Sequence, residues 1–214
     1  MRTASKSRRA YHHGNLRRAL LDEALATIRA EGVEGVTLRD IGARLGVSRT
    51  ALYRHFADKR ALLAAVATEG FRMLRERLVA AWEEGNRGDD AFHAMGVAYV
   101  QFAVDNPSHY RVMFGGFVDA QAKDPELGTE ARGAFQALVD AVVALQRDGV
   151  FLAEDAVLMS THTWALVHGV AMLAIDGQLP GPADVDALMR YSFRRLRTGI
   201  LVNTGTSRVA CAPG

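Results

Sequence analysis

Apolar side chains recur every three to four positions along most of this chain, and that spacing is typical of amphipathic helices. The pattern is clearest over residues 15–31, whose apolar stripe consists of Leu16, Leu20, Leu21, Ala24, Leu25 and Ile28. Further helices are expected over residues 59–84, 90–105, 107–114, 124–148, 154–177 and 182–202. No stretch alternates apolar and polar residues for long enough to build a sheet, and no solenoid repeat is visible. The pattern predicts an all-α protein of about nine helices.

Residues 37–56 predict two short amphipathic helices joined by a tight turn. Each helix has an apolar pair one turn apart, Ile41 with Leu45 and Leu52 with Phe56. Gly46 suits the C-cap of the first helix, and Ser48 suits the N-cap of the second. The outer side of the second helix carries basic and hydroxyl groups, from Arg49, Thr50, Tyr53, Arg54 and His55. A short helix of this kind fits the major groove of DNA, so the segment is interpreted as a helix-turn-helix.

Charge is distributed unevenly along the 214 residues, although the formal net charge is only +2. Residues 1–60 contain 13 Lys+Arg and 6 Asp+Glu, whereas residues 61–214 contain 13 and 18. A basic N-terminal region beside an acidic remainder indicates a polyanionic partner for the N-terminal region alone. A solvated basic face is the alternative, but its coincidence with the helix-turn-helix favours double-stranded DNA.

The helix-turn-helix lies within a longer ordered string over residues 16–66, T-x-x-D-I-x-x-x-x-G-V-S, then L-Y-x-H-F, then K-x-x-L-L. Its members include Gly46, Val47, Ser48, Leu52, Tyr53, His55, Phe56, Lys59 and Leu62. The string resembles the TetR (tetracycline repressor) family of transcriptional regulators. Residues 164–169, W-A-L-V-H-G, resemble the Trp/His-Gly signature of one subgroup of regulator C-terminal domains. The resemblance implies a homodimer with a regulatory C-terminal domain, and repression that a small ligand relieves.

Four segments are expected along the chain. Residues 1–13 form a flexible basic arm, and residues 14–60 form the helix-turn-helix DNA-binding domain. Residues 61–203 form a larger helical domain for ligand binding and dimerisation, and residues 204–214 form a flexible tail. Arg8 and Arg9 of the arm are candidates for phosphate or minor-groove contacts, although the arm has no specific role in the alternative interpretation.

The DNA contacts are expected around the start of the second helix of the motif. Ser48 caps that helix and leaves outward-facing N–H groups, while Arg49 has the reach for a bidentate contact to guanine. Thr50 or Ala51 can touch a thymine methyl group, and Thr37 can bind a phosphate.

The family resemblance adds three candidate contacts, Tyr53, His55 and Lys59, of which the lysine matches a phosphate-binding position. Each basic or aromatic candidate also has a structural interpretation. Tyr53 could pack against the domain, and His55 could only cap its helix. Arg44 and Arg54 could equally be solvated or ion-paired.

The last two helices are the candidates for dimerisation. Residues 154–177 carry the small residues Ala165 and Gly169 four positions apart, and residues 182–202 carry Leu188, Tyr191, Leu196 and Ile200. Two copies of this helix pair could form a four-helix interface across a two-fold axis. The alternative is that these side chains only close the core of one protomer.

A binding site for a small apolar or aromatic effector is expected in the C-terminal domain, because aromatic, Met and His residues are dense there. The candidate lining residues are Phe102, Tyr110, Met113, His162, Trp164 and His168. For each of them, a place in an ordinary core is the alternative.

Other classes of protein find little support. The chain has no H-E-x-x-H motif and no Walker loop, and its single cysteine, Cys211, supports neither a disulfide framework nor a zinc site. No catalytic residue, metal or cofactor is therefore expected. No apolar run approaches the length of a membrane span and no signal segment is apparent, which predicts a cytoplasmic protein. The alternatives are a DNA-binding activator, a nucleoid-type factor without ligand release, and an all-helical enzyme.

Overall fold

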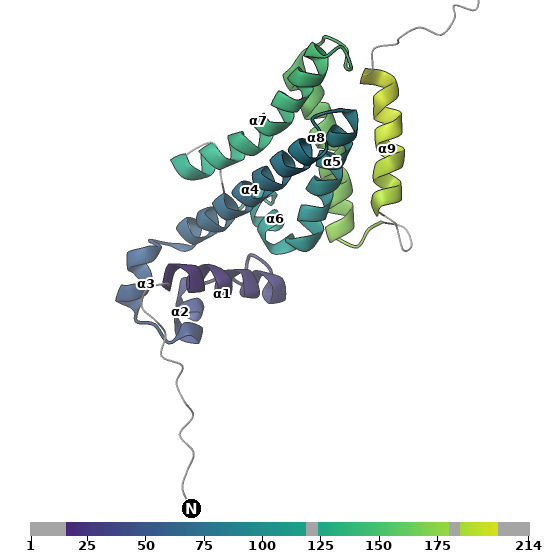
Figure 1. Cartoon of the computed structure of the whole chain (residues 1–214). Helices are drawn as coiled ribbons and strands as arrows, with labels where there is room; N and C mark the ends of the chain where they lie inside the picture. The colour runs from purple at the N-terminus through teal and green to yellow at the C-terminus, as the bar shows by residue number, and fades with distance from the viewer. Residues whose placement is uncertain (1–15, 119–123, 180–184, 201–214) are drawn as a thin grey trace, which may run out of the picture.

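The computed structural model describes residues 16–118, 124–179 and 185–200. In these ranges every regular element is a helix, which confirms the all-α prediction (Figure 1). The helices are α1 (Leu16–Glu31), α2 (Leu38–Leu45), α3 (Arg49–His55), α4 (Lys59–Glu84), α5 (Asp89–Asp105), α6 (Pro107–Phe114), α7 (Pro125–Arg147), α8 (Ala156–Ile175) and α9 (Val185–Ile200).

Helices α1, α2 and α3 form a small N-terminal unit, and the long helix α4 runs from this unit into the rest of the chain (Figure 1). Helices α5, α6 and α7 pack directly against α4, and α8 packs against α5 and α7. Helix α9 lies on the outside of α5 and α8 (Figure 1). We call α4–α9 the body. Helix α1 also packs against α4 and α6, so the N-terminal unit contacts two helices of the body.

Short polar side chains begin the helices around the tight turn. Thr37, Ser48 and Asp58 each accept a hydrogen bond from the backbone N–H three residues later, at 3.2, 3.2 and 2.8 Å. Each cap satisfies one of the unpaired amides at a helix start. Helix α2 ends at Gly46, whose φ of +66° is a left-handed conformation that glycine adopts without strain. The predicted caps therefore hold α2 and α3 at a fixed angle.

Arg44 ties α2 to α1. Its guanidinium donates to the Thr27 hydroxyl at 3.0 Å and forms ion pairs with Glu31 at 2.7 Å and Glu23 at 3.3 Å. The structure thus favours the ion-paired interpretation of this arginine. Beneath this guanidinium, the apolar stripe of α1 packs in one core with Ile41 of α2 and Leu52 of α3, both of which are almost fully buried. This core determines how α3 is presented to solvent.

The predicted helices all exist, and within the described residues their ends differ by a few residues. The expected bounds of the last helix, 182 and 202, lie outside the described residues. Helix α8 starts two residues later than expected because Asp155 caps it, accepting from the Leu158 amide at 2.9 Å. The proposed domain boundary after residue 60 falls within the first turn of α4. The predicted arm over 1–13, with Arg8 and Arg9, and the tail over 204–214, with Cys211, lie outside the described residues.

Helix α8 corrects one expectation from sequence. Its 20 residues have a mean hydropathy of 1.3, so by length and composition it could cross a membrane. Within the protomer, 33% of this apolar segment is buried.

Candidate functional site

Helix α3 lies at the edge of the N-terminal unit (Figure 1). Its polar side chains are exposed to solvent. Leu52 is only 2% exposed and anchors the helix to the core of the unit. The opposite side is solvated and carries Arg49, Thr50, Tyr53, Arg54 and His55. The guanidinium carbon of Arg49 lies 5.9 Å from the centroid of the Tyr53 ring, so the two side chains, four residues apart, share one face. The tyrosine is 45% exposed, which disfavours a mainly packing role.

The basic groups of α3 are electrostatically available. Among the residues that the structure describes, neither Arg49 nor Arg54 pairs with a carboxylate, whereas Arg18 and Arg44 do. The Ser48 cap engages only the Ala51 amide, so the earlier amides of α3 point outward with partial positive charge. This surface is suited to a phosphate or a base edge.

Two predicted contacts, Thr37 and Lys59, have partners within the protein. The Thr37 hydroxyl donates to the Asp40 carboxylate at 2.7 Å and accepts from the Asp40 amide. The Lys59 ammonium donates to the Glu34 carbonyl at 3.0 Å, which braces the turn after α1. Lys59 keeps two further protons, so its phosphate contact stays a prediction. The contact of the half-buried Ala51 with a thymine methyl group also stays a prediction.

Glu69 on α4 joins the N-terminal unit to the body. Its two carboxylate oxygens bind the Arg18 guanidinium of α1 at 2.6 Å and the His109 ring of α6 at 3.2 Å. Beside this cluster the Ser108 hydroxyl approaches the Leu25 carbonyl at 3.4 Å. Three helices therefore meet in one polar junction, which sequence patterns did not indicate because its members are far apart in the chain.

The junction predicts a specific loss of stability in acid. The hydrogen bond from His109, reinforced by Arg18, lowers the pKa of Glu69 from 4.5 to about 2. A carboxylate with a lowered folded-state pKa stabilises the protein above the unfolded pKa and loses that contribution as pH falls toward 2. Its contribution at neutral pH is on the order of 2 kcal/mol. We therefore expect Glu69→Gln to weaken the wild-type decline in unfolding free energy between pH 5 and pH 2, measured by urea denaturation.

The exposed carboxylate of Glu76 on the same helix provides the control. Glu76→Gln should leave the pH profile of unfolding close to that of the wild type. A profile for Glu69→Gln that parallels the wild type over the whole acid range would contradict the stabilising role of the junction.

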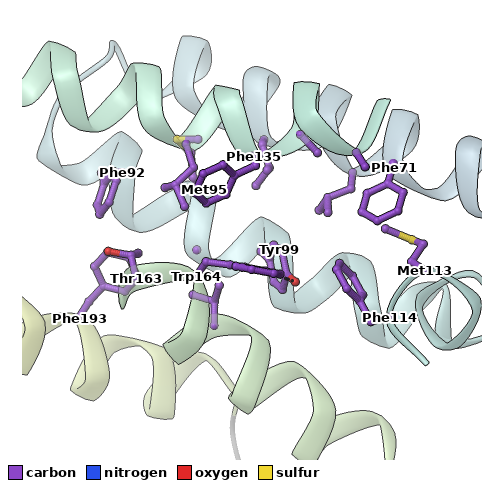
Figure 2. Close-up of a pocket in the computed structure, with 17 residues that line it drawn as sticks. Phe71, Phe92, Met95, Tyr99, Met113, Phe114, Phe135, Thr163, Trp164 and Phe193 are labelled. Carbon is purple, nitrogen blue, oxygen red and sulfur yellow. Dashed lines mark hydrogen bonds between the residues drawn. The ribbon is translucent and has the colours of Figure 1, made fainter. Parts of the chain in front are cut away.

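An apolar cavity of about 260 Å³ lies in the body, among helices α4 to α9 (Figure 2). Aromatic side chains dominate its wall, and none of its lining residues is charged. Phe71, Phe92 and Phe135 come from three different helices and converge on the space with Trp164 (Figure 2). Such a site suits an apolar guest that is oriented by few polar groups.

The polar groups next to the cavity form one connected network. Trp164 donates its indole N–H to the Tyr99 hydroxyl at 3.0 Å, and that hydroxyl lies 2.9 Å from the Tyr110 hydroxyl. The Tyr110 hydroxyl is in turn 2.7 Å from His168 Nδ1. Burial raises the pKa of Tyr99 to about 12, raises that of Tyr110 and lowers that of His168. All members of the network are therefore uncharged at neutral pH.

Of the six predicted lining residues, two line the cavity, two lie behind its wall and two lie away from it. Met113 and Trp164 line the cavity, as predicted. Tyr110 and His168 lie behind Tyr99, hydrogen-bonded to its hydroxyl. Phe102 and His162 do not line this cavity. Phe102 is fully buried elsewhere, beneath the Arg77 guanidinium, and His162 is exposed on the outer side of α8.

Helix α8 exposes an apolar stripe, which we define as Val157, Leu158, Ala165, Gly169 and Leu173. Leu158 is 70% exposed, and a Cβ atom added at Gly169 would meet nothing within 4 Å. On α9, Tyr191 is exposed and Leu188 half-buried. Leu196 and Ile200 face the core of their own protomer, so the core-closing alternative holds for these two residues.

Comparison with known protein families identifies both parts of the chain. Residues 20–66 match the family described as bacterial regulatory proteins, tetR family, and residues 92–196 match the tetracyclin repressor-like C-terminal domain. Together these two matches cover more than half of the 214 residues.

Individual relatives extend over nearly the whole chain. An uncharacterised HTH-type transcriptional regulator, YobS of Bacillus subtilis, is 25% identical over 89% of this chain and 95% of its own. A solved structure of a protein of unknown function from Rhodococcus sp. RHA1 is 32% identical, with a TM-score of 0.80, over 91% of this chain and all of its own. The class C tetracycline repressor of Escherichia coli is 49% identical over 51 residues, which are 24% of this chain and 23% of that one.

Proposed function

Because the chain belongs to the TetR family of bacterial transcriptional regulators, we propose that it binds a palindromic operator as a homodimer and is released by a small apolar or aromatic ligand. The family consists of DNA-binding regulators with a helix-turn-helix and a C-terminal ligand-binding domain, and its members are not enzymes. The observation that carries the proposal is the exposed, carboxylate-free basic face of α3.

Dimerisation through α8 and α9 would supply the second recognition helix. The apolar stripe on α8 runs along one face and is interrupted only by the exposed Thr161 and His162, and Ala165 and Gly169 on it permit close approach of a second helix. Tyr191 would extend the same interface onto α9. Two protomers related by a two-fold axis would place two α3 helices about one turn of DNA apart, or slightly more. This assembly would also cover the apolar surface of α8 in a cytoplasmic protein.

In the proposed complex the contacts divide between bases and phosphates. Arg49 would form the bidentate contact to guanine, and Thr50 or Ala51 would touch a thymine methyl group. Phosphates would be bound by Lys59 and by the groups at the start of α3, with Tyr53 and His55 beside them. Thr37 would contribute its backbone amide, since its hydroxyl is engaged by Asp40. The partner is therefore double-stranded DNA with a short palindrome.

Arg49→Ala tests the recognition role of α3. After selection of an operator from a random DNA pool, we expect this change to weaken operator binding by about 1–3 kcal/mol and binding to random DNA much less. The reason is that the lost contact is made to a base edge rather than to the backbone. Titrations of both DNAs at fixed salt, followed by fluorescence anisotropy, measure the difference.

Lys59→Ala is the matched charge-removal control. It should weaken binding to every sequence alike and reduce the salt slope by about one. Equal losses on operator and random DNA for Arg49→Ala would show that this arginine contacts only phosphates. A footprint of the wild type distinguishes a short palindrome near a promoter from diffuse, nucleoid-type coverage, and a promoter assay gives the sign of regulation.

Ligand release would use the packing between the cavity and the polar junction. Met113 lines the cavity and packs so closely on α4 that a Cβ at Gly70 would lie 2.5 Å from its Sδ atom. His109, one turn earlier on α6, binds Glu69 and through it Arg18 of α1. A guest that displaces Met113 would move α6 against α4 and α1, and so change the separation of the two recognition helices. The effector must favour that arrangement, and its differential affinity limits the response.

A further inference from the structure

The wall of the cavity lacks not only charge but also free hydrogen-bond donors. Three lining side chains carry a polar hydrogen: Tyr99, Thr163 and Trp164. Thr163 donates to the Met159 carbonyl at 3.0 Å, and Trp164 donates to the Tyr99 oxygen. Whether the cavity can donate to a guest therefore depends on the Tyr99 proton alone.

Counting protons in the network determines where the Tyr99 proton goes. When His168 Nδ1 is an acceptor, three protons from Trp164, Tyr99 and Tyr110 meet three acceptors. Trp164 then donates to Tyr99, Tyr99 to Tyr110, and Tyr110 to His168. The reverse order, in which Tyr110 donates to Tyr99 and Tyr99 donates to His168, would use the 3.2 Å contact to Nδ1 in place of the 2.7 Å contact, so the shorter hydrogen bond favours the order given first. When Nδ1 carries a hydrogen, the two hydroxyl oxygens are the only acceptors, and because only one proton can lie between the two hydroxyls, the other hydroxyl proton is left without a partner. Buried donors are almost always satisfied, so the first arrangement holds in the empty protein.

In that arrangement the Tyr99 oxygen accepts from Trp164 and donates to Tyr110, and it keeps one lone pair for a guest. The cavity therefore offers hydrogen-bond acceptors and no side-chain donor. A carboxylate or phosphate accepts hydrogen bonds only, so it would be buried here without a donor or a counter-charge, which is strongly unfavourable.

Cavity size limits the guest further. A cavity of roughly 150 Å³ lined by aliphatic and aromatic side chains takes one benzene. By proportion, 260 Å³ takes about ten non-hydrogen atoms, which is the size of a bicyclic aromatic or a short-chain alkylphenol. The flat aromatic wall favours stacked or edge-to-face contacts with such a ring.

We propose that the effector is an uncharged aromatic compound of about ten non-hydrogen atoms, whose single hydroxyl group donates a hydrogen bond to Tyr99. This inference specifies the ligand of the function proposed above and depends on the cavity being its binding site. It assigns Tyr99, rather than His168 or His162, as the residue that orients the guest.

Three probes with one ring system test the chemistry: 2-naphthol, naphthalene and 2-naphthoate. Binding to the full-length protein is followed by quenching of tryptophan fluorescence and by isothermal titration. We expect 2-naphthol to bind about tenfold more tightly than naphthalene, and 2-naphthoate not to bind at millimolar concentration. Binding of 2-naphthoate as tight as that of 2-naphthol would overturn the proposal, and so would the absence of binding by all three probes.

Two variants that each remove one hydroxyl group locate the hydrogen bond. Tyr99→Phe removes the proposed acceptor, so the preference for 2-naphthol over naphthalene should disappear. In Tyr110→Phe, Tyr99 can donate directly to His168 Nδ1, 3.2 Å away, and the preference should persist. A preference retained by Tyr99→Phe would overturn the proposal, provided that its melting curve and circular dichroism match those of a folded protein.

Operator titrations with and without 2-naphthol separate this inference from the proposed release mechanism. If 2-naphthol binds in the expected pattern and raises the melting temperature but leaves operator affinity unchanged, the ligand class stands and release by this ligand fails. If 2-naphthol lowers operator affinity in the wild type and not in Tyr99→Phe, both are supported.

Discussion

Replacing Gly169 by glutamate is expected to leave the protomer folded, to make the protein monomeric and to abolish tight operator binding. A side chain at this position meets nothing within 4 Å in the protomer, and glutamate favours a helix more than glycine does. In the proposed dimer, however, two carboxylates would be buried without partners near the two-fold axis. At about 2 kcal/mol for each, dimer dissociation should be promoted by roughly a thousandfold.

Sedimentation velocity at micromolar concentration measures the oligomeric state, and anisotropy with the selected operator measures the loss of affinity. Ala80→Glu is the matched control, because it adds the same charge at an exposed alanine of α4, outside the proposed interface. The control should remain dimeric and bind the operator. A dimeric Gly169→Glu protein with normal operator affinity would place the interface elsewhere and leave the apolar stripe on α8 unexplained.

The N-terminal unit could be predicted from sequence because its signals are local. The cap at Ser48, a left-handed glycine at Gly46 and apolar pairs one turn apart all lie within 20 residues, and each determines backbone geometry directly. The structure places these residues in the predicted roles. The fate of single charged side chains was not predictable, since Arg44 finds partners on α1 up to 21 residues earlier.

The sequence predicts that the C-terminal domain has an apolar, aromatic cavity, but it does not identify which residues line that cavity. Phe92 and Phe102 lie on the same helix with similar apolar neighbours, yet only Phe92 lines the cavity, because a stripe does not reveal which of its residues border a void. His162 and His168 are six positions apart, about 240° around a helix, so they could not both face inward. Trp164 and Met113 were predicted only from the density of aromatic, Met and His residues in the C-terminal domain, and both border the void.

The junction of Glu69, Arg18 and His109 had no sequence signal at all. Arg18 and Glu69 are 51 positions apart, and His109 is a further 40. In the sequence, each of them is a single charged or polar residue of a helical pattern, and such a residue is normally interpreted as solvent-exposed. Only the packing of α1 and α6 on α4 brings them together, so such tertiary polar contacts limit what periodicity can predict.

Gly96→Ala is expected to lower the melting temperature by about 5 °C, which is large for the addition of one methyl group. Gly96 on α5 is covered by α9, and a Cβ atom there would lie 2.5 Å from Phe193 Cε2, 2.9 Å from its Cζ and 3.3 Å from Met189 Cε. An aromatic ring cannot bend aside as a flexible chain can, and this ring is already held edge-on by Phe92 at 5.8 Å. The added methyl must therefore push α9 outward.

Differential scanning calorimetry of Gly96→Ala and of a second helical glycine, Gly133→Ala, separates crowding from helix propensity. At Gly133 the nearest atom is Arg75 Cδ at 3.0 Å, on a flexible side chain that can move, so that variant should melt at or above the wild-type temperature. Equal melting temperatures for the two variants would show that α9 yields freely. Because Phe193 also lines the cavity and α9 carries Tyr191 of the proposed interface, Gly96→Ala should weaken 2-naphthol binding and dimerisation together. This result would establish that the ligand wall and the dimer helix are one mechanical element.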